Sequence, residues 1–260
     1  MYSSKLLNKA LKLYNDGDFS QAIEKLEEIV YQDPTYYPAY NLLGCFFISH
    51  GLLSQAEKYF KKIIKLNPNQ PETYNNLGYL YLRQGKFDLA ERYLNQAIKS
   101  NEFDAEARNN LALLYKYQKC YDKAIDQFNK VLTIAPDSPE AYNNLGCIFK
   151  EKGLHEKAIE LFNKVLKLNP EDIEALNNLG CTFKSLGKLK KATALFEKAL
   201  VINPGDETVN YNLGITYSEL GYKKKAVNQF KQYLHNTKDG YHADQVSNWI
   251  ENLEKASQLV

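Results

Sequence analysis

The sequence lacks the segments that would place a chain in a membrane or outside the cell. It has no run of about 18 apolar residues, the length that a membrane-spanning helix needs. Its first residues, MYSSKLLNKALKLYNDGDFS, show no basic stretch followed by an apolar core and a cleavage site. We therefore expect a cytoplasmic protein with no membrane insertion.

Cysteine and net charge are also scarce. The four cysteines include no close pair of the kind that structural zinc sites use, and they do not resemble a disulfide framework. We expect free, partly buried thiols, no metal and no cofactor. The 33 basic side chains nearly balance 31 acidic ones, and the net charge of +2 does not by itself attract any class of partner.

What the sequence does contain is a repeat with a period of 34 residues. The pair Leu-Gly, once replaced by Leu-Ala, recurs at this spacing, beginning at Leu43, Leu77, Leu111, Leu145, Leu179 and Leu213. An alanine lies twelve residues after each small residue, and a Phe or Leu follows four residues later. A fixed period of this length indicates stacked supersecondary units.

This pattern resembles the tetratricopeptide repeat family, whose repeat is a helix-turn-helix marked by an aromatic, Leu-Gly, Ala, Phe and a closing Pro. In that register the chain holds seven repeats over residues 3–240, at 3–36, 37–70, 71–104, 105–138, 139–172, 173–206 and 207–240. The resemblance implies an all-α, right-handed solenoid in which each repeat consists of an A helix, a turn and a B helix. Most turns contain a glycine, namely Gly17, Gly51, Gly85, Gly153, Gly187 and Gly221.

Repeat four departs most from the family pattern. It has Arg108 in the aromatic position, Ala112 for the glycine of the A helix and Lys119 for the glycine of the turn. In addition, Glu102 stands where the preceding repeat should close with proline. Because the helical phasing is intact, we interpret this repeat as locally looser and not as a domain boundary.

After the repeats, residues 241–260 are expected to form a carboxy-terminal capping helix. Val246, Trp249, Ile250 and Leu253 fall at helical spacing on one face, which could cover the apolar end of a repeat stack. The alternative is a docking helix for a partner.

Asparagines recur at positions 5 and 6 of the A helices. Helix geometry places positions 2, 5, 6, 9, 12 and 13 on one face, and the aromatic residues and Leu-Gly pairs on the other. The expected peptide-binding groove therefore includes two series of amides: Asn76, Asn110, Asn144, Asn178 and Asn212 at position 6, and Asn75, Asn109, Asn143 and Asn177 at position 5.

Each asparagine costs roughly 0.6 kcal/mol relative to alanine in a helix, so the series needs a reason. A side-chain amide can bond a peptide group whatever residue the partner carries. The array is similar to that of the O-linked N-acetylglucosamine transferases, whose asparagine ladder holds an extended peptide, although their catalytic domain is missing here. The alternative is that the amides bond within the scaffold.

A row of cations accompanies these amides. Lys116, Lys150 and Lys184 occupy position 12 of their repeats, and Arg83 occupies position 13. Their combined field would suit an acidic protein or peptide. The alternative is that the glutamates at position 2 of the same face neutralise them.

The sequence thus predicts a non-enzymatic scaffold or adaptor that binds an extended peptide in its groove. No catalytic or nucleotide-binding motif occurs, and a small-molecule substrate is not expected. Two alternatives are a substrate-recruiting accessory subunit of a transferase and a helical-repeat RNA binder. The nearly neutral charge argues against nucleic acid as a partner.

Overall fold

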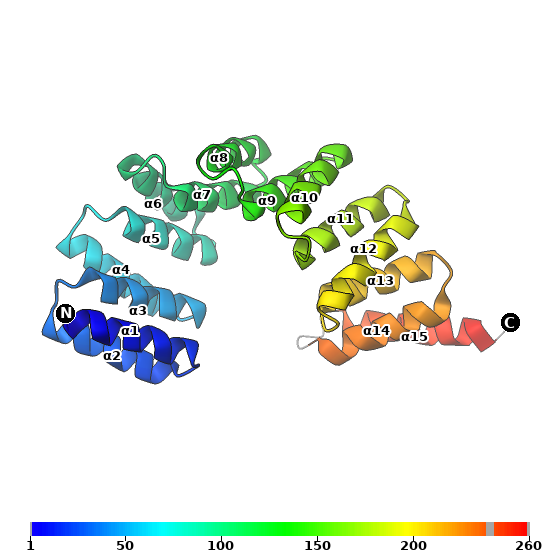
Figure 1. Ribbon diagram of the computed structural model, residues 1–260, viewed down its shortest axis with the longest axis horizontal. Coiled ribbons are helices and arrows are strands. Elements are labelled where there is room, and N and C mark those ends of the chain that lie inside the picture. The colour runs from blue at the N-terminus through cyan, green and yellow to red at the C-terminus, as the bar shows by residue number, and fades with distance from the viewer. Residues whose placement is uncertain (1, 238–241, 259–260) are drawn as a thin grey trace. The chain divides into compact units, whose positions relative to one another are not determined.

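The computed structural model describes residues 2–237 and 242–258, and this part of the chain is built from helices without strands (Figure 1). The helices form two compact units, one ending at Pro136 and the other beginning at Asp137. None of the described helices combines the length and the apolar character that crossing a bilayer requires.

The described helices follow the predicted repeats. The first unit contains α1 (Tyr2–Asn15), α2 (Phe19–Gln32), α3 (Tyr37–Ser49), α4 (Leu53–Leu66), α5 (Pro71–Arg83), α6 (Phe87–Ser100), α7 (Ala105–Tyr117) and α8 (Tyr121–Ile134). The second contains α9 (Pro139–Glu151), α10 (His155–Leu168), α11 (Ile173–Ser185), α12 (Leu189–Ile202), α13 (Glu207–Glu219), α14 (Lys223–Asn236) and α15 (Ala243–Gln258). Odd-numbered helices up to α13 are the A helices of seven repeats, and even-numbered ones are the B helices.

Each A helix packs against the B helix of its own repeat, and within a unit each B helix packs against the next A helix. Successive A helices also touch, α3 with α5 and α5 with α7 in the first unit, and α9 with α11 and α11 with α13 in the second. Fully buried phenylalanines fill the B-helix side of these contacts: Phe60, Phe128, Phe162, Phe196 and Phe230. Because burying such a side chain contributes about 1.5–3 kcal/mol, the residues that mark the repeat also hold it together.

The turn between the A and B helices needs a left-handed backbone conformation. All six predicted turn glycines adopt it, with φ between 69° and 86°. Lys119 takes the same conformation in repeat four, with φ 58°, which costs a residue with a side chain about 1–2 kcal/mol. The turn is thus the same in all seven repeats, with or without glycine.

The glycine inside the A helix has a different role, because it allows the B helix to come close. A Cβ atom at Gly146 would lie 2.5 Å from the ring of Phe162. We expect Gly146→Ala to lower the free energy of unfolding by about 1–2 kcal/mol, since overpacking outweighs the gain in helix propensity. Thermal melting measures this. An unchanged melting temperature would show that the ring moves aside without cost.

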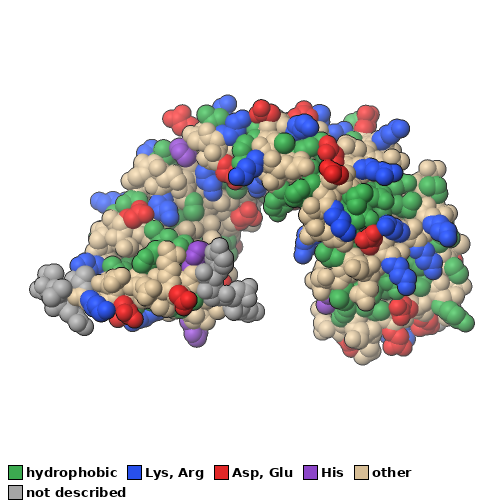
Figure 2. All heavy atoms as spheres, turned by 180° about the vertical axis from the view of Figure 1, so that it is seen from behind, with side chains coloured by type: hydrophobic (Ala, Val, Ile, Leu, Met, Phe, Trp, Pro, Cys, Tyr) green, Lys and Arg blue, Asp and Glu red, His purple; other side chains and the backbone are tan. Residues whose placement is uncertain are grey.

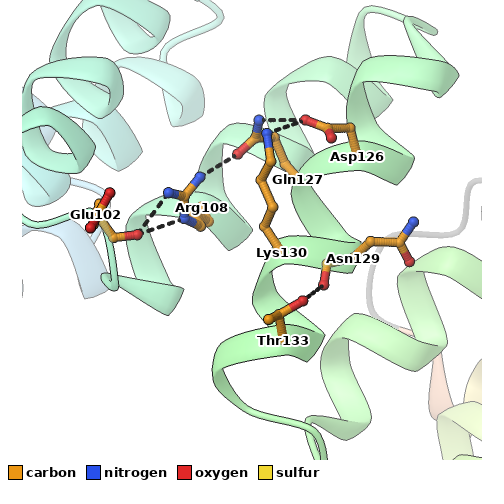
Figure 3. Close-up of polar contacts among 7 residues, drawn as sticks. All are labelled: Glu102, Arg108, Asp126, Gln127, Asn129, Lys130 and Thr133. Carbon is orange, nitrogen blue, oxygen red and sulfur yellow. Dashed lines mark hydrogen bonds and ion pairs between the residues drawn. The ribbon is translucent and has the colours of Figure 1, made fainter.

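Arg108 shows how repeat four accommodates its departures from the pattern. Its Nε and Nη2 donate hydrogen bonds of 2.9 and 2.7 Å to the backbone carbonyl of Glu102, and its Nη1 donates one of 3.2 Å to Gln127 on α8 (Figure 3). The guanidinium therefore ties α7 and α8 to the loop that lacks the proline. Helix α7 contacts both α5 and α6, as the equivalent A helices of other repeats contact their neighbours. The division between the compact units comes after this repeat, at Pro136, which the uninterrupted 34-residue count did not predict.

The carboxy-terminal helix α15 caps the second unit, as predicted. Val246 and Ile250 are buried, and the Trp249 ring lies with its centroid 5.5 Å from that of Phe230. Lys231 on α14 forms an ion pair of 2.8 Å with Glu254 at the edge of this contact. The predicted apolar stripe therefore packs on α14.

Candidate functional site: the A-helix face

The asparagines of successive A helices are bonded to one another across the repeats. In each pair the Nδ2 atom at position 6 donates to the Oδ1 atom at position 5 of the preceding repeat. The pairs, which we call rungs, are Asn76 to Asn41 at 3.2 Å, Asn110 to Asn75 at 2.8 Å, and Asn212 to Asn177 at 2.9 Å. These three rungs use part of the amide capacity within the scaffold.

Most of the predicted position-5 asparagines are less accessible than the helical wheel suggests. Asn75, Asn109 and Asn143 are buried, and so is Asn110 at position 6. The helical wheel treats each helix alone, whereas the contact between successive A helices covers this part of the face. The remaining amides, at Asn76, Asn144, Asn177, Asn178 and Asn212, are half-buried.

One rung in the second unit is open. The Oδ1 atom of Asn143 on α9 is buried, and no donor among the described residues reaches it. The expected donor, the side-chain amide of Asn178 on α11, makes no hydrogen bond within the described part of the chain. A buried acceptor without a partner costs about 1–3 kcal/mol, so a donor from a bound partner would be favourable at this rung.

Two of the predicted cations, Lys150 on α9 and Lys184 on α11, lie on the same two helices as the open rung, about two helical turns further along. Both are half-buried, and neither has a carboxylate of the described residues within ion-pair distance. Burial raises the pKa of the nearby Cys181 thiol, and the positive charges of these two lysines oppose that rise. Neither lysine is therefore neutralised by an ion pair with the position-2 glutamates.

The other two predicted cations belong to the first unit. Lys116 on α7 is half-buried, and Arg83 on α5 is exposed and donates a 3.3 Å hydrogen bond to the hydroxyl of Tyr79. The four cations thus fall on two compact units, two on each. Over the face visible in Figure 2, basic and acidic side chains are interspersed.

The thiols differ in exposure. Cys45 and Cys120 are exposed, not partly buried as expected, while Cys147 and Cys181 are half-buried, and none of the four forms a disulfide. Cys45, Cys147 and Cys181 share position 9 of their A helices. No group of His, Cys, Asp or Glu side chains within the described ranges is arranged to hold a metal ion.

An apolar pocket of about 230 Å³ lies between α13, α14 and α15, and the sequence analysis did not identify it. Its lining residues are Ile215, Ser218, Glu219, Phe230, Trp249, Asn252 and Leu253. Ile215, Ser218 and Glu219 occupy positions 9, 12 and 13 of repeat seven, which are groove-face positions. The pocket forms only when α15 is in place, so the repeat pattern alone could not reveal it.

The repeat geometry agrees with comparisons to known families. Tetratricopeptide repeat models match residues 37–70, 75–139, 139–172, 173–206 and 208–234, which together span most of the chain. The chain belongs to the tetratricopeptide repeat family. No curated protein matches the sequence.

Solved structures of other tetratricopeptide repeat proteins have the same fold. A tetratricopeptide repeat protein from Parabacteroides merdae is 20% identical with a TM-score of 0.73, over 97% of this chain and 98% of that one. Another is YrrB, described as a TPR protein with an unusual peptide-binding site, which is 23% identical with a TM-score of 0.52, over 72% and 97%. Yeast Tom70 is 17% identical with a TM-score of 0.73, over 98% of this chain and 54% of its own.

Proposed function

We propose that this tetratricopeptide repeat protein is a non-enzymatic scaffold whose second unit holds an extended segment of a partner protein. The segment would lie against the A helices α9, α11 and α13. Repeats of this family serve protein–protein interaction, and one structural relative is described as having a peptide-binding site. The observation that carries the proposal is the open rung between Asn143 and Asn178.

The open rung has the chemistry needed to hold a peptide backbone. A backbone N–H group of the partner can donate to Oδ1 of Asn143, and a backbone carbonyl can accept from the amide of Asn178. Such bonds satisfy groups that the scaffold leaves unsatisfied, and they do not depend on the partner's side chains. They favour an extended segment, because only exposed backbone offers both groups.

Two further features of the second unit indicate which residues the partner segment carries and in what order they lie. The charges of Lys150 and Lys184 favour an acidic residue about two helical turns from the open rung. The pocket beside α15 favours a bulky apolar side chain further along. Helix spacings of about 8–10 Å separate α11, α13 and α15, so about three to six extended residues would join the two features.

In the first unit the rungs at Asn75–Asn110 and Asn41–Asn76 are closed. We therefore assign those amides to the scaffold. For the same partner, or a second segment of it, we propose Arg83 and Lys116 as additional contacts on α5 and α7. Amide recognition is thus proposed at repeats five and six, and charge recognition in both units.

The test uses the only tryptophan, Trp249, which lines the pocket. The probe is a synthetic ten-residue peptide of Asp, Ser and Gly that carries one Phe about five residues after its acidic end. We expect the peptide to change the fluorescence of Trp249, and we expect its Phe-to-Ala version to bind without that change. The double variant Lys150→Glu/Lys184→Glu should weaken binding about 10–100-fold, and more so at low salt.

The matched control is Lys164→Glu/Lys167→Glu, which makes the same charge change on the B helix α10. It should leave peptide affinity within about twofold of wild type, because those lysines lie outside the groove face. A peptide affinity that changes neither with salt concentration nor in the Lys150→Glu/Lys184→Glu variant would rule out the proposed site. Stronger binding of single-stranded RNA than of the peptide would favour the RNA-binding alternative.

A further inference from the structure

The turns between the A and B helices of repeats six and seven carry an unusual concentration of lysine. Their sequences are GKLKKA at 187–192 and GYKKKA at 221–226. Five of these lysines are exposed, namely Lys188, Lys190, Lys191, Lys224 and Lys225. We call them the lysine edge. The second unit carries equal numbers of acidic and basic side chains, so the edge results from local segregation of charge.

The two turns form one continuous surface. A shallow depression is lined by Gly187, by Lys188 to Lys191 and by Leu220, which belongs to the end of α13 beside the second turn. The adjoining depression is lined by Gly221, Tyr222 and the three lysines that follow it. The charges of both turns therefore face the same region of solvent, and their fields add.

The described carboxylates do not pair with the lysine edge. Within the described residues, none of its five lysines has an acidic oxygen within ion-pair distance. Two of them are instead held over aromatic rings, with the Lys191 ammonium 5.4 Å from the Phe183 ring centroid and that of Lys225 5.2 Å from Tyr217. These contacts fix the position of the charge without cancelling it.

The position of these lysines is also unfavourable for the helices that carry them. They lie in or next to the first turns of α12 and α14, where the helix dipole repels cations, and neither first turn contains an acid. The equivalent turns of α6, α8 and α10 contain Asp88, Asp122 and Glu156. Repeats six and seven therefore place cations where folding alone would favour anions.

Exposed apolar side chains lie among these charges. Leu186 and Tyr222 flank the two turns and are 37% and 48% exposed. Lysines surrounding exposed leucine and tyrosine suit the interface of an anionic bilayer, where the charges meet phosphate head groups and the apolar groups enter the head-group boundary. The second unit contains no arginine, the residue that binds nucleic-acid phosphates and bases in a bidentate way.

We propose that the lysine edge docks the protein peripherally on a membrane surface rich in anionic phospholipid. The contact is electrostatic, with Leu186 and Tyr222 at the head-group boundary. It leaves the A-helix face of the second unit open, because the edge lies at the turns and not along α9, α11 and α13. It does not depend on the peptide-binding proposal.

Flotation of the full chain with vesicles tests this. We expect binding to phosphatidylcholine vesicles that contain about 30% phosphatidylserine, little binding to pure phosphatidylcholine, and loss of binding as salt rises. The triple variant Lys188→Glu/Lys190→Glu/Lys224→Glu should reduce partitioning about 100-fold, since each lysine near an anionic surface contributes about fivefold. Its melting temperature should not fall, because glutamate suits the first turn of a helix.

The matched control reverses Lys65, Lys99 and Lys167. These exposed lysines share one position at the opposite end of the B helices and give the same change in net charge. The control should keep at least half of the wild-type vesicle binding. Equal losses in the two variants, or no binding of wild type at low salt, would overturn the proposal. So would binding of polyglutamate or single-stranded RNA through the edge lysines in the absence of vesicle binding.

Discussion

Replacing Ile250 with alanine should lower the free energy of unfolding of the second unit by about 2–5 kcal/mol. Ile250 is 7% exposed and lies on α15 beside Val246, where it covers the apolar side of α14. The substitution removes buried methyl groups at the end of a stack that has no further repeat to compensate. Deleting residues 241–260 should have a larger effect and cause aggregation.

Chemical denaturation followed by circular dichroism measures both effects. The control is Glu251→Ala, the next residue along the helix, which is exposed and should change stability by less than about 0.5 kcal/mol. If the truncated protein stays monomeric and melts at the wild-type temperature, α15 is dispensable for the stack. Its role as a docking element would then be the better interpretation.

Removing two closed rungs of the asparagine ladder should lower stability by about 1–3 kcal/mol, mostly at the buried Oδ1 of Asn75. The double variant Asn110→Ala/Asn212→Ala deletes the donors to Asn75 and Asn177. Each deletion leaves an amide oxygen without its donor, at about 1–3 kcal/mol per site where that oxygen is buried. The gain in helix propensity of roughly 0.6 kcal/mol per alanine offsets only part of this loss.

The matched control is Asn178→Ala, which makes the same substitution at the same repeat position where no rung is closed. It should melt at or above the wild-type temperature while weakening the acidic peptide probe. If all three alanines stabilise the protein equally, the closed rungs contribute nothing to folding. If Asn178→Ala destabilises as much as Asn110→Ala, the open rung closes in solution, and the proposed peptide site loses its basis.

The sequence predicted the parts of this fold that depend on one helix or one turn. The 34-residue period, the glycines at the turns and the apolar stripe of α15 are local patterns, and each has the expected structure. What the sequence did not predict depends on how neighbouring repeats approach. The burial of Asn75 and Asn143 follows from the contacts of α5 with α7 and of α9 with α11, which no helical wheel contains.

In repeat four, too, the sequence did not predict an interaction between residues of different elements. Its mismatched residues suggested looseness when each was considered alone. The bonds from Arg108 to the carbonyl of Glu102 join two of those departures into one interaction. The lysine edge also went unnoticed, because its two halves lie 34 residues apart and only the stacking of repeats six and seven brings them together.

The packing of each helix only against its near neighbours has a consequence for folding kinetics. Among the described residues, the main contacts between helices within a unit join elements that are at most two apart along the chain. Loop-closure entropy therefore stays small at every step, and low contact order predicts rapid folding for a chain of this size. Local unfolding should proceed one repeat at a time from the ends of each unit. Native-state hydrogen exchange should then show amide protection rising from α1 toward the interior of the first unit.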